Sequence, residues 1–294
     1  MKKLAFVTDS GSGFSAEYWS REGIYSVPLQ LDIDGTTAGD YETVQPSDIV
    51  ENLKKQIPMK TSLPSLGAIE DLFEDLKARG YDGVFCIPIC RGLSGTLNAM
   101  ELAARNQDLE FTGFDTGSTA VLQAYCIREA KKLYEEGKDI PDILAFLDKV
   151  CEKADTILLV DDLQHMKRGG RLTAAAALLG GLLKIKPVLH VNCQTDGKVD
   201  VLGKVRTVSK AQGFVIDRLK SLGAGPGWDI TIAHVGVPEP AEAYAQRIRE
   251  AIPGITTRII DLVSAVAVHT GLGCLAVQAF DSQGQAIEYD LTQA

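Results

Sequence analysis

The chain has 294 residues, 45% of them hydrophobic, which is enough for one large α/β core or two cores of ordinary size. Its formal net charge of −9 argues against general binding of nucleic acid or of acidic membranes by the molecule as a whole. The longest apolar stretches are too short to span a bilayer, and Asp9 follows the first apolar run too closely for a signal peptide.

Strand-length apolar runs alternate with helical patterns in the first half of the chain. Strands are expected at Leu4–Val7, Val84–Ile89, Leu109–Phe114 and Thr156–Val160. Helices are expected around Ile69–Leu76, before Gly80, and then at Ser94–Arg105, Thr119–Glu136 and Ile143–Val150. This alternation predicts an α/β fold with a mostly parallel sheet covered by helices on both faces, which is a three-layer α/β/α arrangement.

The pattern changes after about residue 155. Asp196-Gly197 is a hairpin signal between two strand-like runs, Lys186–Asn192 and Lys198–Val205. Further helices are expected at Ala174–Leu183, Val208–Leu222 and Pro240–Ala251, and strands near Asp229–Val235 and within Ala265–Phe280. We therefore expect an N-terminal α/β domain over residues 1–155 and a C-terminal α+β domain over residues 156–294, with the ligand site in the cleft between them.

Three short segments far apart in the chain bring hydroxyl groups, backbone N–H groups or an imidazole to turns. They are Thr61–Ser65, Leu93–Thr96 and His269–Gly273. Ser94 is expected at or near a helix N-cap, and Thr61 and Ser62 near a helix start, where unpaired N–H groups attract anions. Each segment alone fits ordinary capping. Together they favour a shared site for one small anion. The ring of His269 follows an expected strand, Val263–Val268, and is either a core residue or a ligand-facing one.

A basic turn, Lys167–Arg171, stands out in this acidic chain, and Arg206 lies in the same half. Arginine beside paired glycines suits recognition of phosphate or carboxylate, while solvated surface charge explains it equally well. His165, His190 and His234 lack metal-ligand spacing, so no zinc site is expected. The six cysteines form no C-x-x-C pair, and Cys86 and Cys90 are interpreted as buried hydrophobic residues in a reducing cytoplasm.

Gly11–Ala16 matches the G-x-G-x-x-A dinucleotide fingerprint directly after a strand. Gly23 follows within two turns, whereas the fingerprint requires a full helix, so a plain turn is favoured over a nucleotide-binding oxidoreductase. Asp9 and Ser10 remain as polar groups at the carboxyl end of a strand, where open α/β sheets hold ligands.

The chain resembles the DegV family of bacterial lipid-binding proteins, because several motifs occur in the same order along the sequence. The motifs are Val7-Thr8-Asp9-Ser10, Val27-Pro28-Leu29, Thr61–Ser65, Leu93–Thr96, Asp115-Thr116, Lys167–Arg171, Lys186–Leu189 and His269-Thr270-Gly271. The resemblance implies a two-domain α/β protein that binds a long-chain fatty acid between its domains. It also implies presentation of the carboxylate to a separate ATP-dependent fatty acid kinase, which forms the acyl phosphate, with transient contact at a membrane surface.

Carried over position by position, the resemblance assigns the carboxylate to Thr61, Ser62, Ser94, Gly95, Thr96, His269 and Thr270. Arg171, with Lys167, Arg168 and Arg206, would meet the kinase or the phosphorylated product. No cofactor, metal or catalytic residue is implied. This chain departs from the family pattern at Cys90-Arg91-Gly92, Thr116 and Leu272, which changes the expected shape of the pocket.

Two further points stay open at the level of sequence. Ala174–Leu183 and Val121–Tyr125 are candidates for the walls of an acyl tunnel, although core packing explains them equally well. The alternative function is a serine-dependent acyl hydrolase with Ser94 as nucleophile and His269 as base. Leu93-Ser94-Gly95 lacks the G-x-S-x-G elbow of such enzymes, and no acidic residue is identifiable that would orient the histidine.

Overall fold

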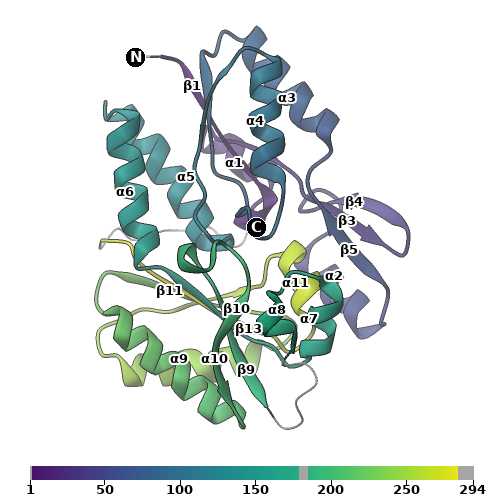
Figure 1. The fold of residues 1–294 in the computed structure, drawn as a ribbon, viewed down its shortest axis with the longest axis vertical. Coiled ribbons are helices and arrows are strands. Elements are labelled where there is room, and N and C mark those ends of the chain that lie inside the picture. The colour runs from purple at the N-terminus through teal and green to yellow at the C-terminus, as the bar shows by residue number, and fades with distance from the viewer. Residues whose placement is uncertain (1, 179–184, 284–294) are drawn as a thin grey trace.

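The computed structural model describes residues 2–178 and 185–283, and its first half is built on a four-stranded parallel sheet (Figure 1). The strand order is β2-β1-β6-β7, with bounds β1 (Leu4–Asp9), β2 (Tyr25–Val27), β6 (Gly83–Cys86) and β7 (Glu110–Gly113). The prediction of a mostly parallel sheet in the first half of the chain is therefore confirmed.

Helices cover both faces of this sheet because successive strand residues point to opposite sides. Val7 and Cys86 pack against α3 (Leu66–Ala78) and α4 (Thr96–Asn106). Phe6 and Phe85 stack on the other face, with ring centroids 5.5 Å apart. That face is covered by α1 (Ala16–Arg21), α5 (Ala120–Glu135) and α6 (Ile140–Glu152). The predicted three layers are confirmed, with Cys86 and Cys90 buried as free thiols.

A small antiparallel sheet between β2 and α3 was not expected from the sequence. Its order is β4-β3-β5, with bounds β3 (Gln30–Ile33), β4 (Thr36–Gly39) and β5 (Met59–Ser62), and α2 (Pro46–Lys54) lies between β4 and β5. Thr61 and Ser62 end strand β5, so their expected position at a helix start was wrong. Helix α3 begins only at Leu66, with Ser65 as N-cap. Pairing with β3 fixes the position of Thr61.

The second half of the chain forms a six-stranded mixed sheet in the order β10-β9-β8-β13-β11-β12. The bounds are β8 (Asp155–Leu159), β9 (Lys186–Val191), β10 (Asp200–Val205), β11 (Trp228–His234), β12 (Arg258–Asp261) and β13 (Leu275–Asp281). Only β11 and β12 are parallel. The hairpin is confirmed, since Asp196 and Gly197 both have positive φ between β9 and β10. The chain thus has the expected second α+β unit, while the boundary at residue 155 stays a prediction.

The two faces of the six-stranded sheet have different neighbours. Helices α9 (Val208–Leu222) and α10 (Pro238–Ala251) pack on one face. The other face meets α7 (Leu163–Gly169), α8 (Ala174–Leu178) and α11 (Ser264–Thr270), together with the small sheet of the first half. Two short 3-10 helices, η1 (Ser10–Ser12) and η3 (Cys193–Thr195), complete the described elements. No helix in residues 2–178 or 185–283 is long and apolar enough to cross a membrane.

Helix α11 replaces the strand that the sequence predicts at Val263–Val268. Periodicity cannot separate a short apolar run in a strand from one in a buried helix. Here Ala265, Ala267 and Val268 pack into the core shared with the small sheet. The expected strand over Ala265–Phe280 therefore begins only at Leu275. Of the expected helix Ala174–Leu183, the first five residues form α8, and residues 179–183 lie outside the described part of the chain.

The polar residues at the end of β1 are used inside the fold. The buried Asp9 carboxylate accepts hydrogen bonds from the backbone N–H of Ile89 (3.1 Å) and from Gln123 Nε2 (2.8 Å). Ser10 Oγ donates to Asp40 Oδ2 at 2.8 Å. Burial raises the pKa of Asp9 to about 6 and the pKa of Asp40 to about 7. These carboxyl groups tie β1 to the elements around it, so they do not form the ligand site considered from the sequence.

The buried carboxyl of Asp40 predicts a specific dependence of stability on pH. Because its folded pKa lies above the unfolded value of about 3.9, its neutral form stabilises the fold below about pH 4. That contribution is lost as the pH rises through about 7. We expect the Asp40→Asn variant to lose this dependence, which amounts to at most about 1.4 kcal/mol per pH unit.

Urea unfolding at about pH 5 and about pH 8 measures this effect. The matched control is Asp71→Asn, an exposed carboxylate on α3, which is expected to keep the wild-type pH dependence. If the stability difference between wild type and Asp40→Asn is the same at both pH values, Asp40 does not titrate as described.

Candidate functional site

A mostly apolar cavity of about 910 Å³, counting the space at its mouth, lies between the small sheet and the six-stranded sheet. Both halves of the chain contribute its walls, which include Leu29, Leu63, Ile89, Leu93, Leu158, Met166, Val191, Ile260, Leu262, Ala265 and Ala276. The cavity therefore lies in the region where the sequence predicted a ligand.

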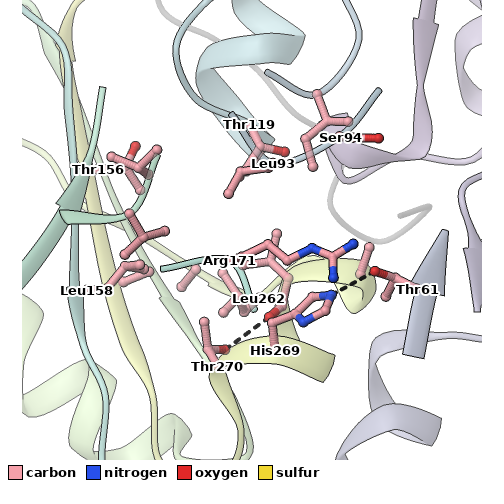
Figure 2. Close-up of a pocket in the computed structure, with 18 of the residues that line it drawn as sticks. Thr61, Leu93, Ser94, Thr119, Thr156, Leu158, Arg171, Leu262, His269 and Thr270 are labelled. Atoms are coloured by element: carbon pink, nitrogen blue, oxygen red, sulfur yellow. Dashed lines mark hydrogen bonds between the residues drawn. The ribbon is translucent and has the colours of Figure 1, made fainter. Parts of the chain in front are cut away.

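One end of the cavity carries a hydrogen bond between segments 208 residues apart. Thr61 Oγ1, on β5, lies 2.7 Å from His269 Nε2, in the last turn of α11. Figure 2 shows these two side chains facing each other beside Arg171, with Ser94 on the wall apart from them and Thr156 and Leu158 on the other side of the cavity. The structure thus places Thr61 and His269 in direct contact, and Ser94 lines the same cavity.

The imidazole of His269 is held by close packing on its other edge. A side chain at Gly169 would overlap His269 Nδ1, so the backbone of α7 reaches the ring only because residue 169 is glycine. Nδ1 is buried and has no hydrogen-bond partner among the described residues. The ring is therefore fixed between β5 and α7, with Nε2 directed at the Thr61 hydroxyl.

His269 is neutral at physiological pH. Burial is the main cause, and the positive charge of Arg171 and the electrostatic effect of the nearby His165 add to it, so that the pKa of His269 falls to about 4. A neutral imidazole has one N–H donor and one acceptor. At this end the cavity consequently offers hydroxyl and imidazole groups that can donate to an anion without pairing it with a histidine cation.

Of the three residues of the Leu93–Thr96 segment that were expected to hold the carboxylate, only Ser94 lines the cavity. Ser94 lines the cavity, and its Oγ lies 2.8 Å from Thr96 Oγ1. The N-cap of α4 is Gly95, without a side-chain cap, so Ser94 lies near the N-cap, one residue before it, and does not cap the helix itself. Gly95 is exposed and Thr96 is buried, and neither is among the residues that line the cavity.

Ser62 and Thr270, the sequence neighbours of Thr61 and His269, differ in whether their hydroxyl groups are free to bind a ligand. Ser62 lines the cavity at the end of β5. Thr270 also lines it, but its hydroxyl donates to the carbonyl of Val266 at 3.2 Å within α11. The hydrogen of Thr270 is therefore already engaged, whereas the hydroxyl of Ser62 makes no hydrogen bond to another side chain among the described residues.

The predicted basic residues lie at different depths. Half-buried Arg171 lines both the cavity and a wide outer groove, and its Nη1 donates to the carbonyl of Gly169 at 2.9 Å. Exposed Arg168 lines the outer groove, which also contains Thr61 and His269. Lys167 and Arg206 are exposed and line neither space. Arg171 is thus the basic side chain at the boundary between cavity and groove, and a role in partner or phosphate contact stays a prediction.

Sequence reasoning missed the polar part of the cavity floor and most of its apolar wall. Thr156, Thr231 and Gln278 line the cavity from three strands of the large sheet. Of the two tunnel candidates, Val121 lines the cavity, but Ala124 and Tyr125 pack in the core. The described part of α8 does not line it. A period of two in β8, where Thr156 and Leu158 share a face, was the available signal.

The structure does not assemble a hydrolytic triad from the expected residues. The partner of Ser94 is Thr96, and the partner of His269 is Thr61. No carboxylate bonds His269 Nδ1 within the described residues, so the histidine has no acidic orienter there. At the dinucleotide motif, Ser10–Ser12 form a 3-10 turn and α1 has six residues, in keeping with a plain turn. Within residues 2–178 and 185–283 no cluster of three potential metal ligands is present.

Comparison with known proteins identifies close relatives over nearly the whole chain. The family model described as an uncharacterised protein of the DegV family matches residues 3–282. A DegV domain-containing protein from Streptomyces coelicolor is 31% identical over 281 residues, which are 94% of this chain and 98% of the relative.

Solved structures agree with this assignment of relatives. A fatty acid binding DegV family protein from Streptococcus agalactiae has a TM-score of 0.84 at 30% identity, covering 95% of this chain and 99% of its own. A fatty acid binding protein, DegV, from Bacillus subtilis has a TM-score of 0.82 at 26% identity, with 96% and 100% covered. The same two-part α/β fold is therefore present in each.

The buried environment of His269 predicts its titration in the ligand-free protein. NMR of the imidazole carbons is expected to show His269 neutral until the pH falls to about 4. Its folded pKa lies below the unfolded value of about 6.5, so protonation favours unfolding as the pH falls through this range. His269→Gln, which removes the resonance, provides the assignment.

Arg171→Gln tests the second cause of the same shift. Loss of the guanidinium charge is expected to raise the pKa of His269, while burial keeps it below the ordinary value of about 6.5. A wild-type His269 that titrates near 6.5 would contradict the buried, neutral ring.

Proposed function

The chain belongs to the DegV family, and on that premise we propose that it binds one long-chain fatty acid in the cavity between its sheets. The carboxylate is held by Thr61, Ser94 and His269, with Ser62 beside them. The observation that carries the proposal is the Thr61–His269 hydrogen bond at one end of an otherwise apolar cavity. The fatty acid binding relatives from Streptococcus agalactiae and Bacillus subtilis support the same ligand class.

Burial of the acyl chain supplies most of the favourable free energy in this proposal. Each buried methylene contributes about 0.8 kcal/mol before the cost of ordering the ligand. An unpaired carboxylate in the same environment would cost several kcal/mol, so it requires several donors. The hydroxyls of Thr61 and Ser94 and the N–H of neutral His269 meet that need. The head group then mainly fixes the direction in which the chain enters.

Neutral donors also suit a carboxylate that has to react. We propose that a separate ATP-dependent fatty acid kinase phosphorylates the bound carboxylate, and that this chain acts as a carrier without chemistry of its own. Hydroxyl and imidazole donors leave the carboxylate oxygen more nucleophilic than a close ion pair would. Arg171 is the nearest fixed cation on the way out of the cavity, since it lines both the cavity and the outer groove.

The kinase is proposed to meet the face that surrounds the outer groove. Arg168 and Arg171 line that groove, and Lys167 is exposed on the same helix α7. We propose that exposed Arg206 also belongs to this basic surface. Transfer would take place in the cytoplasm, with transient contact at a membrane surface where the chain is loaded. The division into domains of residues 1–155 and 156–294 is part of the same proposal, with the acyl chain between them.

Head-group variants test the carboxylate site. Protein purified under gentle conditions is expected to carry a fatty acid in native mass spectrometry. Thr61→Val and Ser94→Ala are each expected to weaken binding of added fatty acid about ten- to one-hundred-fold, as for the loss of a hydrogen bond to a charged group. Thr36→Val, an exposed residue of the same small sheet, is the matched control.

Two results would remove this proposal. One is a wild-type protein that is free of lipid and does not bind added fatty acid. The other is unchanged binding in both Thr61→Val and Ser94→Ala. A chromogenic ester provides the remaining comparison, because turnover abolished by Ser94→Ala would favour the acyl hydrolase instead.

A further inference from the structure

Three polar side chains cross the cavity floor in a single row. Thr231 on β11 pairs with Gln278 on β13, and Gln278 pairs with Thr156 on β8. All three line the cavity. The next row on the same face, two residues along each strand, is Ala233, Ala276 and Leu158, which is entirely apolar. Polarity on this floor is therefore confined to one depth.

This row is distinct from the carboxylate end. Thr231 lies three residues, or about 10 Å, before the end of β11. The parallel strand β12 ends at the same edge, where the chain turns through Leu262 into α11 and His269. Figure 2 likewise shows Thr156 across the cavity from Thr61 and His269. An acyl chain anchored at Thr61 and His269 would pass the row with its middle or distal carbons.

Hydrogen-bond accounting leaves one hydroxyl hydrogen in this row without an acceptor. Ser118 Oγ and Thr156 Oγ1 lie 2.7 Å apart and share one hydrogen bond. Both oxygens also lie within hydrogen-bond distance of Gln278 Nε2, at 3.2 and 2.8 Å, and the two hydrogens of that nitrogen are shared with the carbonyl of Thr119 at 2.9 Å. The pair has two O–H groups but only one bond between them, and no other acceptor contacts either hydroxyl in the part of the chain that the structure describes.

Thr156 is the group that can direct this hydrogen into the cavity. It lines the cavity, whereas Ser118 is buried behind it and does not. When Ser118 donates to Thr156, the hydrogen of Thr156 is left for a ligand. Gln278 Oε1 accepts only the backbone N–H of Leu122, at 2.8 Å, among the described residues, and so keeps one lone pair. Thr231, by contrast, already donates to Asp229 Oδ1 at 2.8 Å.

A spare donor beside a spare acceptor matches a ligand hydroxyl group. Resting on the proposed function, we propose that the preferred ligands are fatty acids with a hydroxyl on the chain at the depth of this row. The ligand oxygen accepts from Thr156, and its hydrogen is donated to Gln278 Oε1. A wholly apolar channel would reject such a ligand, because a buried hydroxyl without partners weakens binding about tenfold or more.

The test compares stearic acid with hydroxystearic acids that bear the hydroxyl at successive mid-chain positions. Dissociation constants are measured by calorimetry on delipidated protein. For wild type, at least one positional isomer is expected to bind as tightly as stearic acid or more tightly. Thr156→Val is expected to reduce the preference for that isomer, expressed as the ratio of the two dissociation constants, about five- to tenfold.

Two substitutions control for packing. Thr156→Ser keeps the hydroxyl and is expected to keep the wild-type ratio. Thr231→Val removes a hydroxyl from the same row whose hydrogen is already engaged, and it is also expected to keep the ratio. Because the ratio is measured within each variant, a general loss of affinity in Thr156→Val does not obscure the result.

The outcomes separate this inference from the proposed function. If stearic acid binds and every hydroxystearic isomer binds at least tenfold more weakly, the inference is overturned and fatty acid binding stands. A bound water at Thr156 would give that result. If neither ligand class binds, both the inference and the proposed function fail. If Thr156→Val does not fold, the wild-type isomer series alone decides in the same way.

Discussion

The hydrogen bond between Thr61 and His269 is the constraint on which the site depends. It joins the last residues of β5 to the last turn of α11, and so connects the small sheet of the first half to the second half of the chain. The ring is buried, and burial lowers the pKa of His269 to about 4, so the imidazole is neutral at physiological pH. The proposed head-group contacts on Thr61 and His269 are therefore uncharged, while Arg171 is the cation that lines the same cavity.

Much of the architecture could be predicted because it is local. The alternation of strands and helices predicted the parallel sheet and its two helical layers, and Asp196-Gly197 predicted the hairpin. The small sheet was not predicted because β3, β4 and β5 have four residues each and show no strong alternation of apolar and polar residues. Helix α11 was not predicted because a short apolar run such as Ala265–Val268 has the same composition in a strand as in a buried helix.

The candidate site likewise has a part that could be predicted from the sequence and a part that could not. Thr61, Ser94 and His269 were identified from hydroxyls and an imidazole at turns and from a family resemblance, and the structure brings them to one cavity. The roles within the segments were not predictable: Ser94 is not a helix cap, and Gly95 and Thr96 lie off the cavity. The polar row depends on the register between β8, β13 and β11, which is a long-range property that no stretch of sequence contains.

Because residue 169 is glycine, the partly exposed helix α7 lies directly against the buried imidazole of His269. On one side the backbone of Gly169 touches the ring of His269, and immediately before this glycine Lys167 and Arg168 are exposed on α7. A single peptide thickness therefore separates the outer surface from the innermost polar atom of the site. A side chain at position 169 would therefore displace either the imidazole or the backbone of α7.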